Sequence, residues 1–227
     1  MPDPRDDLAA RVCIASLRRH ASRPLEIHLL KIDELRRKGL FTRPYKVLEN
    51  GQMIDERDSR PFSTQFAFTR FLVPYLSNEP IAVFCDADFM FRADIARLFD
   101  EAEAAAPAPM MCVHHEHAPT ELTKMDGVLQ ARYFRKNWSS LMVMRPNQIR
   151  EQLSLDDINH REGRWLHSMK WLNDEQIGRL DEGWNWLDGW SSLRDPKAVH
   201  FTRGTPDMID DCDPAYAREW RAYAESL

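Results

Sequence analysis

The sequence predicts one α/β domain over residues 1–227, or at most one such domain with a small lobe, in which helices cover a parallel sheet. With 227 residues and 43% hydrophobic content, the chain is long enough to bury a sizeable core. Short apolar runs of strand length alternate along it with amphipathic stretches of helical period. That alternation is typical of a parallel sheet with helices on its faces.

The first half of the chain begins with a helix. Asp6 and Asp7 precede an apolar pattern that ends in arginines before residue 20, as expected for a capped helix. A short strand is predicted over residues 25–30, followed by a polar, irregular segment over 31–60 with a turn at 49–51. Residues 67–76 then predict a helix, 81–85 a buried strand and 95–106 a second helix.

The second half continues the alternation. Residues 110–113, 141–144 and 198–201 are apolar runs of strand length, and residues 165–172 and 174–180 have a helical pattern. Ligands of such sheets collect where the strands end, at their carboxyl edge.

Two aspartates stand at such a strand end. Asp86 and Asp88 directly follow the apolar run 81–85, with one alanine between them. Buried carboxylates are costly without a partner, and an Asp-x-Asp pair supplies oxygen ligands for a hard cation that would neutralise a diphosphate. The alternative is that these loop aspartates only cap the next helix.

Composition narrows the classes of partner. The formal net charge is −5 and the basic residues are spread along the chain, which disfavours nucleic acid but leaves open a small anion held by a few arginines. The sequence contains no basic-then-apolar stretch typical of a signal peptide and no apolar run near the roughly 20 residues that a membrane span needs. The four cysteines form no CxxC pair, so free thiols and a soluble, cytoplasmic protein are expected: Cys13, Cys85, Cys112 and Cys212.

Six segments, in chain order, resemble the family 8 glycosyltransferases. They are FAFTRFLVPYL (66–76), VFCDADFMF (83–91), NWSSLMVM (137–144), NDEQIGRL (173–180), GWNWL (183–187) and VHFTRGTPD (199–207). The likeness covers roughly residues 60–207, with a looser match in the first 30. It implies a GT-A fold and transfer of a sugar from a nucleotide-sugar donor, expected to be a UDP-sugar, with retention of anomeric configuration. The acceptor, whether glycan, lipid-linked or protein, is not identified.

The resemblance implies a metal site. Asp86 and Asp88 match the family's DxD, which holds manganese or magnesium on the diphosphate, and His200 matches the third protein ligand. An imidazole ligand favours Mn²⁺ over Mg²⁺. The other interpretation of His200 is a structural histidine.

The resemblance also implies the donor site. In this chain Ser139 replaces the family's asparagine and Leu141 its glycine, which puts the sugar contacts of that strand in doubt. Arg70 could instead form a surface salt bridge, and Arg203 could be solvated. Donor contacts are implied at Asp3, Arg70, Asp86, Ala87, Asp88, Ser139, Ser140, Arg203 and Gly204.

The catalytic element is implied at Asp174, Glu175 and Gln176, which match the family's Asp-Gln element beside the anomeric carbon. A side chain there is a weak nucleophile, so front-face attack through an ion-pair-like transition state is expected rather than double displacement.

Other conspicuous residues have simpler interpretations. The group of Cys112, His114, His115 and His117 lacks the paired spacing of zinc ligands. Trp184 and Trp186 are expected to pack in the core. From position alone, the acceptor side is assigned to Lys124, Asp126 and Gln130.

The beginning of the chain departs from the family pattern. MPDPRDD resembles the loop and helix that follow the family's first strand, without the strand itself. Either the start of the chain is missing or the nucleotide site is built differently. The reading frame is expected to extend upstream of Met1. Two alternatives to an active transferase stay open. One is a non-catalytic homologue that binds a nucleotide sugar. The other is a phosphohydrolase of the haloacid dehalogenase type, although Met90 stands where such enzymes have threonine or valine and no apolar strand precedes the Asp210–Asp211 pair.

Overall fold

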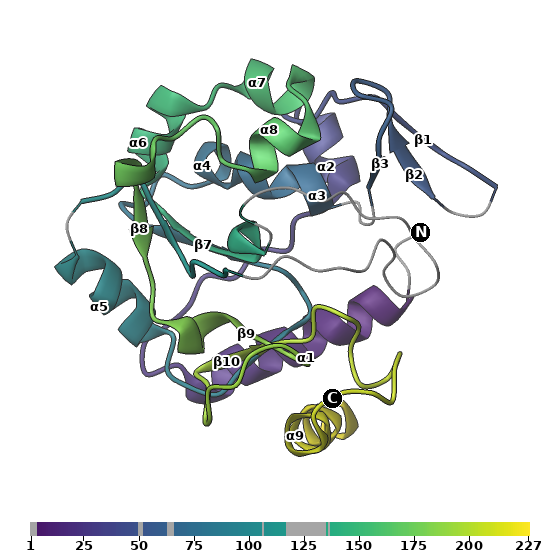
Figure 1. Ribbon diagram of the computed structural model, residues 1–227, viewed down its shortest axis with the longest axis vertical. Coiled ribbons are helices and arrows are strands. Elements are labelled where there is room, and N and C mark those ends of the chain that lie inside the picture. The colour runs from purple at the N-terminus through teal and green to yellow at the C-terminus, as the bar shows by residue number, and fades with distance from the viewer. Residues whose placement is uncertain (1–3, 50–51, 63–65, 106, 117–134, 136) are drawn as a thin grey trace. The chain divides into compact units, whose positions relative to one another are not determined.

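The computed structural model describes residues 4–49, 52–62, 66–105, 107–116, 135 and 137–227 (Figure 1). The chain forms two compact units. The first unit comprises Met1–Ile27, Cys85–Ala106 and Leu180–Leu227, and the second comprises His28–Phe84 and Pro107–Arg179.

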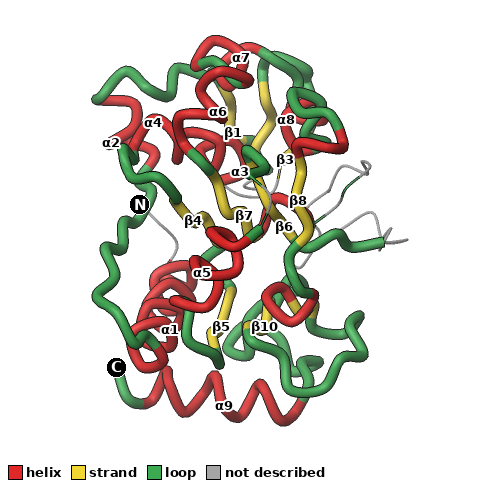
Figure 2. Tube along the Cα trace, turned by 90° about the vertical axis from the view of Figure 1, so that its left-hand side faces the viewer, coloured by secondary structure: helices red, strands yellow, loops and turns green. Residues whose placement is uncertain are grey.

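The first unit contains a three-stranded sheet in the order β5-β10-β9. Strand β10 (Ala198–His200) pairs antiparallel with β5 (Phe89–Phe91) and parallel with β9 (Trp186–Leu187). Helix α1 (Pro4–His20) packs against both β5 and α9 (Pro214–Glu225) (Figure 2). The unit also holds α5 (Ala96–Ala104) and the 3-10 turn η5 (Glu182–Asn185).

The core of the first unit joins residues that are far apart in sequence. Val12 of α1, Met90 of β5, Val199 of β10 and Trp220 of α9 are all buried in one apolar cluster. Helix α9 begins at Pro214, and the Asp213 side chain caps it by accepting hydrogen bonds from the first backbone N–H groups. The buried faces of α1 and α9 therefore hold β5 and β10 in place through side-chain packing.

The second unit contains a four-stranded sheet in the order β4-β7-β6-β8. Strand β6 (Met110–Cys112) pairs antiparallel with β7 (Leu141–Met144) and parallel with β8 (Ile177–Arg179). Strand β4 (Ala82–Cys85) leads from this unit into the first. A separate antiparallel sheet consists of β1 (Tyr45–Val47), β2 (Met53–Asp55) and β3 (Pro61–Phe62).

Short helices complete the second unit. The segment 66–76 is helical throughout, as α3 (Phe66–Thr69), η1 (Arg70–Leu72) and α4 (Val73–Leu76). A buried apolar cluster runs from these helices to the inner strands of the four-stranded sheet. Among the described residues, the other helical elements of this unit are α2 (Ile32–Arg37), η3 (Trp138–Ser140), α6 (Pro146–Gln152), α7 (Leu155–His160), α8 (Gly163–His167) and η4 (Asp174–Gln176).

Two polar contacts fix the loops of the second unit. Arg43 is buried and its Nε donates to Asp55 Oδ1 at 3.1 Å. The Asn159 side chain accepts hydrogen bonds from the backbone N–H groups of Thr42 and Arg43, and its amide donates to the carbonyl of Leu40. Asn159 therefore ties α7 to the loop before β1.

The α/β fold class is confirmed, and the strand pairing is mixed. The β6–β8 and β9–β10 pairs are parallel as expected, whereas the β6–β7 and β5–β10 pairs are antiparallel. Fully buried strands are apolar in either arrangement, so their composition does not determine their direction.

Three predicted elements are wrong in type or extent. Residues 25–30 form no strand, and half of Leu29 is exposed. The helix predicted over 174–180 is instead the single turn η4 followed by β8, and the helix predicted over 165–172 ends at His167. The predicted turn at 49–51 includes residues outside the described part of the chain.

The structure also bears on the cysteines and on the search for membrane-spanning segments. The four cysteines are free thiols. None of the helices among the described residues is both long enough and apolar enough to cross a bilayer.

Candidate functional site

Asp86, Asp88 and His200 come together in the first unit. Asp86 directly follows β4, Asp88 directly precedes β5, and His200 is the last residue of β10. The antiparallel register pairs His200 with Phe89, and the backbone N–H of Phe201 donates to the Asp88 carbonyl at 3.0 Å. This strand pairing brings a histidine beside two aspartates that are more than a hundred residues earlier in the chain.

The three side chains have the geometry of a metal-binding group. One ligand atom from each lies within 4.8 Å of the others, and His200 Nε2 is 3.4 Å from Asp88 Oδ1. Ligand atoms that share an octahedral ion are about 3 Å apart when adjacent and about 4 Å when opposite. Two carboxylates and one imidazole are also suitable donors for Mn²⁺ or Mg²⁺, so the residues present fit such an ion.

The electrostatic environment also favours a cation. A hydrogen bond with Cys85 and burial raise the pKa of the Cys13 thiol well above its usual value, and the negative charges of Asp88 and Asp86 raise it further. The thiol of Cys13 is therefore neutral at physiological pH. The same negative potential that disfavours a thiolate attracts a positive ion.

Packing and a hydrogen bond hold His200 in place. Its ring is stacked on Phe89 with the centroids 4.4 Å apart and the planes 16° from parallel. Its Nδ1 lies 3.0 Å from Asn185 Oδ1, and both side chains are buried. Sequence reasoning did not single out Asn185, although it lies in the segment GWNWL.

Arg203 is part of an ion-paired network in the first unit. Its Nη2 donates to Asp188 Oδ2 at 3.1 Å and its Nη1 to Asp211 Oδ2 at 2.7 Å. Burial alone would lower the pKa of Arg203, but the bonds to Asp211 and Asp188 raise it above its usual value. Arg203 is thus not simply a solvated residue. The adjacent Gly204 has a backbone φ of +140°, which a residue with a side chain rarely adopts.

Arg70, Ser139 and Ser140 lie in the second unit, and all three are buried. Arg70 Nη1 donates to the Ser139 carbonyl at 2.8 Å and lies 3.4 Å from Ser139 Oγ. Ser139 Oγ is also 3.2 Å from Nδ1 of His167. Arg70 is therefore a buried side chain anchored to the backbone of Ser139, not an exposed one.

Asp174, Glu175 and Gln176 form the turn η4 in the second unit. A capping box holds this turn: Asn173 Oδ1 accepts from the Gln176 N–H, and Gln176 Oε1 accepts from the Asn173 N–H at 3.0 Å. Asp174 is largely exposed and forms an ion pair with Arg135. Arg135 could not be singled out from the sequence, because it is one of several basic residues in its segment and no local pattern distinguishes it.

The zinc interpretation gains no support from the described residues. Within them, the group that gathers three potential metal ligands is Asp86, Asp88 and His200. His114 instead stacks on Trp138 with a centroid distance of 4.0 Å, and burial is the main cause of its lowered pKa.

The remaining assignments made from the sequence are either confirmed by burial or fall on residues that the structure does not describe. The predicted packing role of Trp184 and Trp186 is confirmed, because both are buried in the first unit. Five residues named from the sequence lie outside the described part of the chain: Asp3, His117, Lys124, Asp126 and Gln130.

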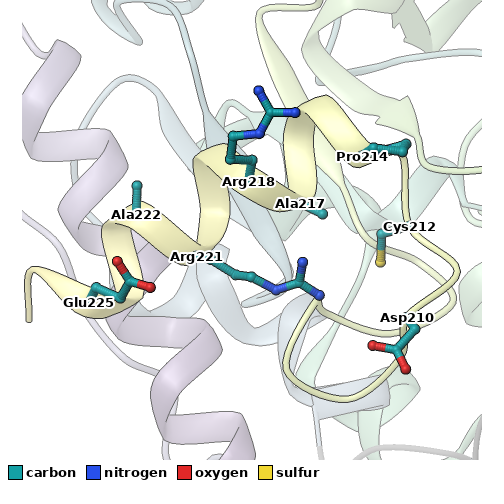
Figure 3. Close-up of a pocket in the computed structure, with 8 residues that line it drawn as sticks. All are labelled: Asp210, Cys212, Pro214, Ala217, Arg218, Arg221, Ala222 and Glu225. Atoms are coloured by element: carbon teal, nitrogen blue, oxygen red, sulfur yellow. The ribbon is translucent and has the colours of Figure 1, made fainter.

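A cavity of about 400 Å³ lies beside α9 in the first unit (Figure 3). Arg221 extends across it toward Asp210, and Arg218 points away from Asp210 (Figure 3). Burial raises the pKa of Cys212, which lines the cavity, to about 12, so this thiol is neutral. None of the predicted site residues lines the cavity.

Comparison with known proteins identifies a curated relative. Protein CDI of Arabidopsis thaliana is 40% identical over 221 residues, which cover 93% of this chain and 80% of that protein. The chain belongs to the Protein CDI family. No family model matches it.

Solved structures with a similar fold are glycosyltransferases of the GT-A type. The galactosyltransferase LgtC, in complex with donor and acceptor sugar analogues, has a TM-score of 0.57 and 15% identity, over 98% of this chain and 93% of LgtC. Mouse xyloside xylosyltransferase 1 has a TM-score of 0.53 and 13% identity, over 90% and 93%. GlyE of Streptococcus pneumoniae has a TM-score of 0.55 and 15% identity; the match covers 96% of this chain but only 57% of GlyE. At these identities the likeness shows the fold, which is that of GT-A glycosyltransferases.

Proposed function

We propose that residues 1–227 act as a single metal-dependent glycosyltransferase domain that transfers a sugar from a nucleotide-sugar donor, expected to be a UDP-sugar, to an acceptor. The observation that carries this proposal is the group Asp86, Asp88 and His200 in a chain with a GT-A fold. Asp-x-Asp after a strand is weak evidence alone, but a histidine from a distant strand completes a three-ligand set here. The phosphohydrolase alternative has no comparable support.

The metal is assigned to Asp86, Asp88 and His200, with Mn²⁺ preferred to Mg²⁺ because of the imidazole ligand. When bound, such an ion stabilises the negative charge that develops on the departing diphosphate. Ala87 keeps the two carboxylates one residue apart, and its backbone is assigned to the donor site.

The donor contacts are assigned to Arg70, Ser139, Ser140, Arg203 and Gly204. Arg70 is already oriented by its bond to the Ser139 carbonyl, so less side-chain entropy is lost when a sugar binds. Arg203 supplies positive charge, and Gly204 allows the backbone to approach a phosphate.

Asp174, Glu175 and Gln176 are assigned to the reacting end of the donor, with retention of configuration. Gln176 Oε1 accepts a hydrogen bond from the Asn173 backbone, which draws electron density from that oxygen and makes it a poorer nucleophile. This supports front-face attack: the bond from the anomeric carbon to the diphosphate breaks, the acceptor hydroxyl adds on the same face, and its proton passes to the departing phosphate oxygen.

Metal-dependent donor binding tests the proposal. A nucleotide sugar and Mn²⁺ present at about 100 times their Kd should stabilise the fold by about 2.7 kcal/mol, which raises the Tm by about 5–10 °C for a chain of this length. Asp88→Asn should abolish the manganese-dependent part of this shift. Asp210→Asn is the control for stability: without ligand, the Tm of Asp88→Asn should be no lower than that of Asp210→Asn. The control residue Asp210 is exposed and lies in the same unit. An Asp88→Asn protein with the donor affinity of the wild type would contradict the metal site.

The stereochemistry requires a separate measurement. With an α-linked donor, proton NMR of the product should show the α anomer, and Gln176→Ala should lower kcat at least tenfold while changing donor Kd less than threefold. An inverted product would refute front-face retention.

A second candidate function is a non-catalytic homologue that binds a nucleotide sugar. Ser139 in place of the asparagine favours it, because the serine side chain is shorter and lies against His167 and Arg70. Manganese-dependent donor binding without turnover, in the presence of a broad set of acceptors, would support this candidate.

A further inference from the structure

Asn185 contacts the candidate metal ligand His200 on the side away from the aspartates. Asn185 Oδ1 lies 3.0 Å from His200 Nδ1, and His200 Nε2 lies 3.4 Å from Asp88 Oδ1. The relative exposure of Asn185 is 0% and that of His200 is 2%. With water excluded, the partner at each nitrogen must come from the protein or from a bound ion.

The backbone around Asn185 is fixed by the same sheet that positions His200. Asn185 is the last residue of η5 and directly precedes β9, whose Leu187 pairs with His200 in the parallel register. The Asp188 N–H donates to the His200 carbonyl at 3.0 Å. The distance between the amide and the imidazole is therefore set by strand pairing, and the stack on Phe89 keeps the ring in its plane.

The tautomer of His200 determines whether it can bind a metal. A neutral imidazole carries one proton, and only the nitrogen without it can donate a lone pair to an ion. An amide oxygen at Nδ1 requires the proton to be at Nδ1. The lone pair is then at Nε2, on the side of Asp88.

We propose that Asn185 is a positioning residue that fixes His200 in the tautomer protonated at Nδ1, so that Nε2 is ready to bind a divalent cation. The inference rests on the proposed metal site and adds the group that prepares it. A hydrogen bond of this kind beyond the direct ligands typically changes metal affinity by about 10–100-fold.

The tautomer can be observed without any substitution at residue 185. A long-range proton–nitrogen NMR spectrum of the metal-free wild type at a pH of about 8 should show His200 protonated at Nδ1 and bare at Nε2. The His200→Gln spectrum identifies the His200 signals by their loss. A His200 ring protonated at Nε2 would overturn the proposal, because the Asn185 amide would then donate to Nδ1 through its nitrogen.

Metal affinity provides the second measurement. Titration of Mn²⁺ followed by electron paramagnetic resonance should give a Kd about 10–100-fold weaker for Asn185→Leu, which has a similar size but no acceptor. Asn185→Asp keeps an acceptor oxygen and should bind Mn²⁺ within about threefold of the wild type or more tightly. Equal affinities for Asn185→Leu and the wild type, or equal losses in both variants, would overturn the proposal.

Two controls separate this inference from the proposed function and from a general loss of stability. Asn159→Leu removes another buried, hydrogen-bonded asparagine, in the second unit, and should keep the wild-type Mn²⁺ affinity. Asp88→Asn should lose Mn²⁺ binding. If Asp88→Asn binds Mn²⁺ like the wild type, the proposed metal site fails. If Asp88→Asn loses Mn²⁺ binding while Asn185→Leu binds Mn²⁺ like the wild type, only the proposed role of Asn185 fails. Should Asn185→Leu not fold, the wild-type spectrum decides.

Discussion

Replacing Arg203 by methionine tests whether its ion pair with Asp188 is structural. Asp188 has an exposed fraction of 0% and Arg203 one of 28%. Asp188 Oδ1 accepts from the Asp213 N–H at 2.9 Å, and its Oδ2 accepts from Arg203 at 3.1 Å. Methionine keeps most of the side-chain length and removes the charge, so Arg203→Met leaves a buried carboxylate without its cation.

The expected cost follows from this geometry. Breaking a buried ion pair by removing one partner costs about 3–5 kcal/mol. Partial exposure of Arg203 lowers that value, and the Asp213 N–H still binds the carboxylate, so we expect a loss of about 3 kcal/mol. At about 2–4 °C for each kcal/mol in a chain of this size, the Tm should fall by about 6–12 °C.

The assay is urea unfolding of the wild type, Arg203→Met, Asp188→Asn and the double variant. Because the double variant has no buried charge, it should be more stable than the sum of the two single losses predicts, with a coupling of more than about 1 kcal/mol. Arg218→Met, the same change at an exposed position of α9, should alter the free energy of unfolding by less than about 0.5 kcal/mol. If Arg203→Met is no less stable than Arg218→Met, the structural role of the pair is refuted.

The same variant tests the proposed donor role of Arg203. At a temperature well below its Tm, Arg203→Met should bind UDP about tenfold more weakly than the wild type if the guanidinium also contacts a phosphate, since one charge-assisted hydrogen bond contributes about 1.5 kcal/mol or more. Loss of stability with unchanged UDP affinity would assign Arg203 to the network with Asp188 and Asp211 alone.

Two further predictions concern a glycine and a titratable side chain. Gly189 has φ +78°, and a Cβ there would lie 2.6 Å from the Arg203 guanidinium. Gly39 has a similar φ of +69°, but a Cβ there would meet nothing within 4 Å, so Gly189→Ala should lower the Tm more than Gly39→Ala. Equal losses of Tm would show that only the backbone conformation matters. The pKa of His114 is lowered, chiefly by burial, so its contribution to stability is present above its unfolded pKa of about 6.5 and is lost as pH falls below it. His114→Phe keeps the stacked ring but cannot take up a proton, so its Tm should fall less than that of the wild type between pH 7.5 and 5.5, and an equal fall in both proteins would exclude this histidine as the cause.

The two aspartates of the candidate metal-binding group could be predicted from sequence because their signals are local. Asp86 and Asp88 follow an apolar run, and such a run with carboxylates at its end is visible without knowledge of the partner strands. His200 was found through the resemblance rather than through periodicity. Its proximity to Asp88 depends on the pairing of β10 with β5, two strands more than a hundred residues apart.

Elements whose structure depends on pairing with a distant strand could not be predicted in the same way. Residues 25–30 alternate as a strand would, but no strand in the described part of the chain pairs with them. Residues 177–179 look helical by spacing, yet they pair with β6, where Gly178 allows close approach: a Cβ there would be 2.8 Å from the Met111 side chain. Asn185 had no distinguishing local pattern, and its contact with His200 exists only once β9 and β10 are side by side.

The two candidate functions differ most in what they require of Ser139. The proposed donor assignment has Arg70 and Ser139 contact the sugar in an active transferase. In the structure they contact each other, through Arg70 Nη1 and the Ser139 carbonyl. A backbone carbonyl cannot be removed by substitution at residue 139, so this bond would persist in a protein with the family's asparagine. The replacement therefore changes the side chain that meets His167 and leaves the anchoring of Arg70 intact. Loss of the asparagine favours a binding protein but does not by itself exclude catalysis, because the guanidinium keeps its position and a serine hydroxyl can still accept or donate one hydrogen bond. Turnover, rather than the pattern of replaced residues, is the property that separates an enzyme from a binding protein here.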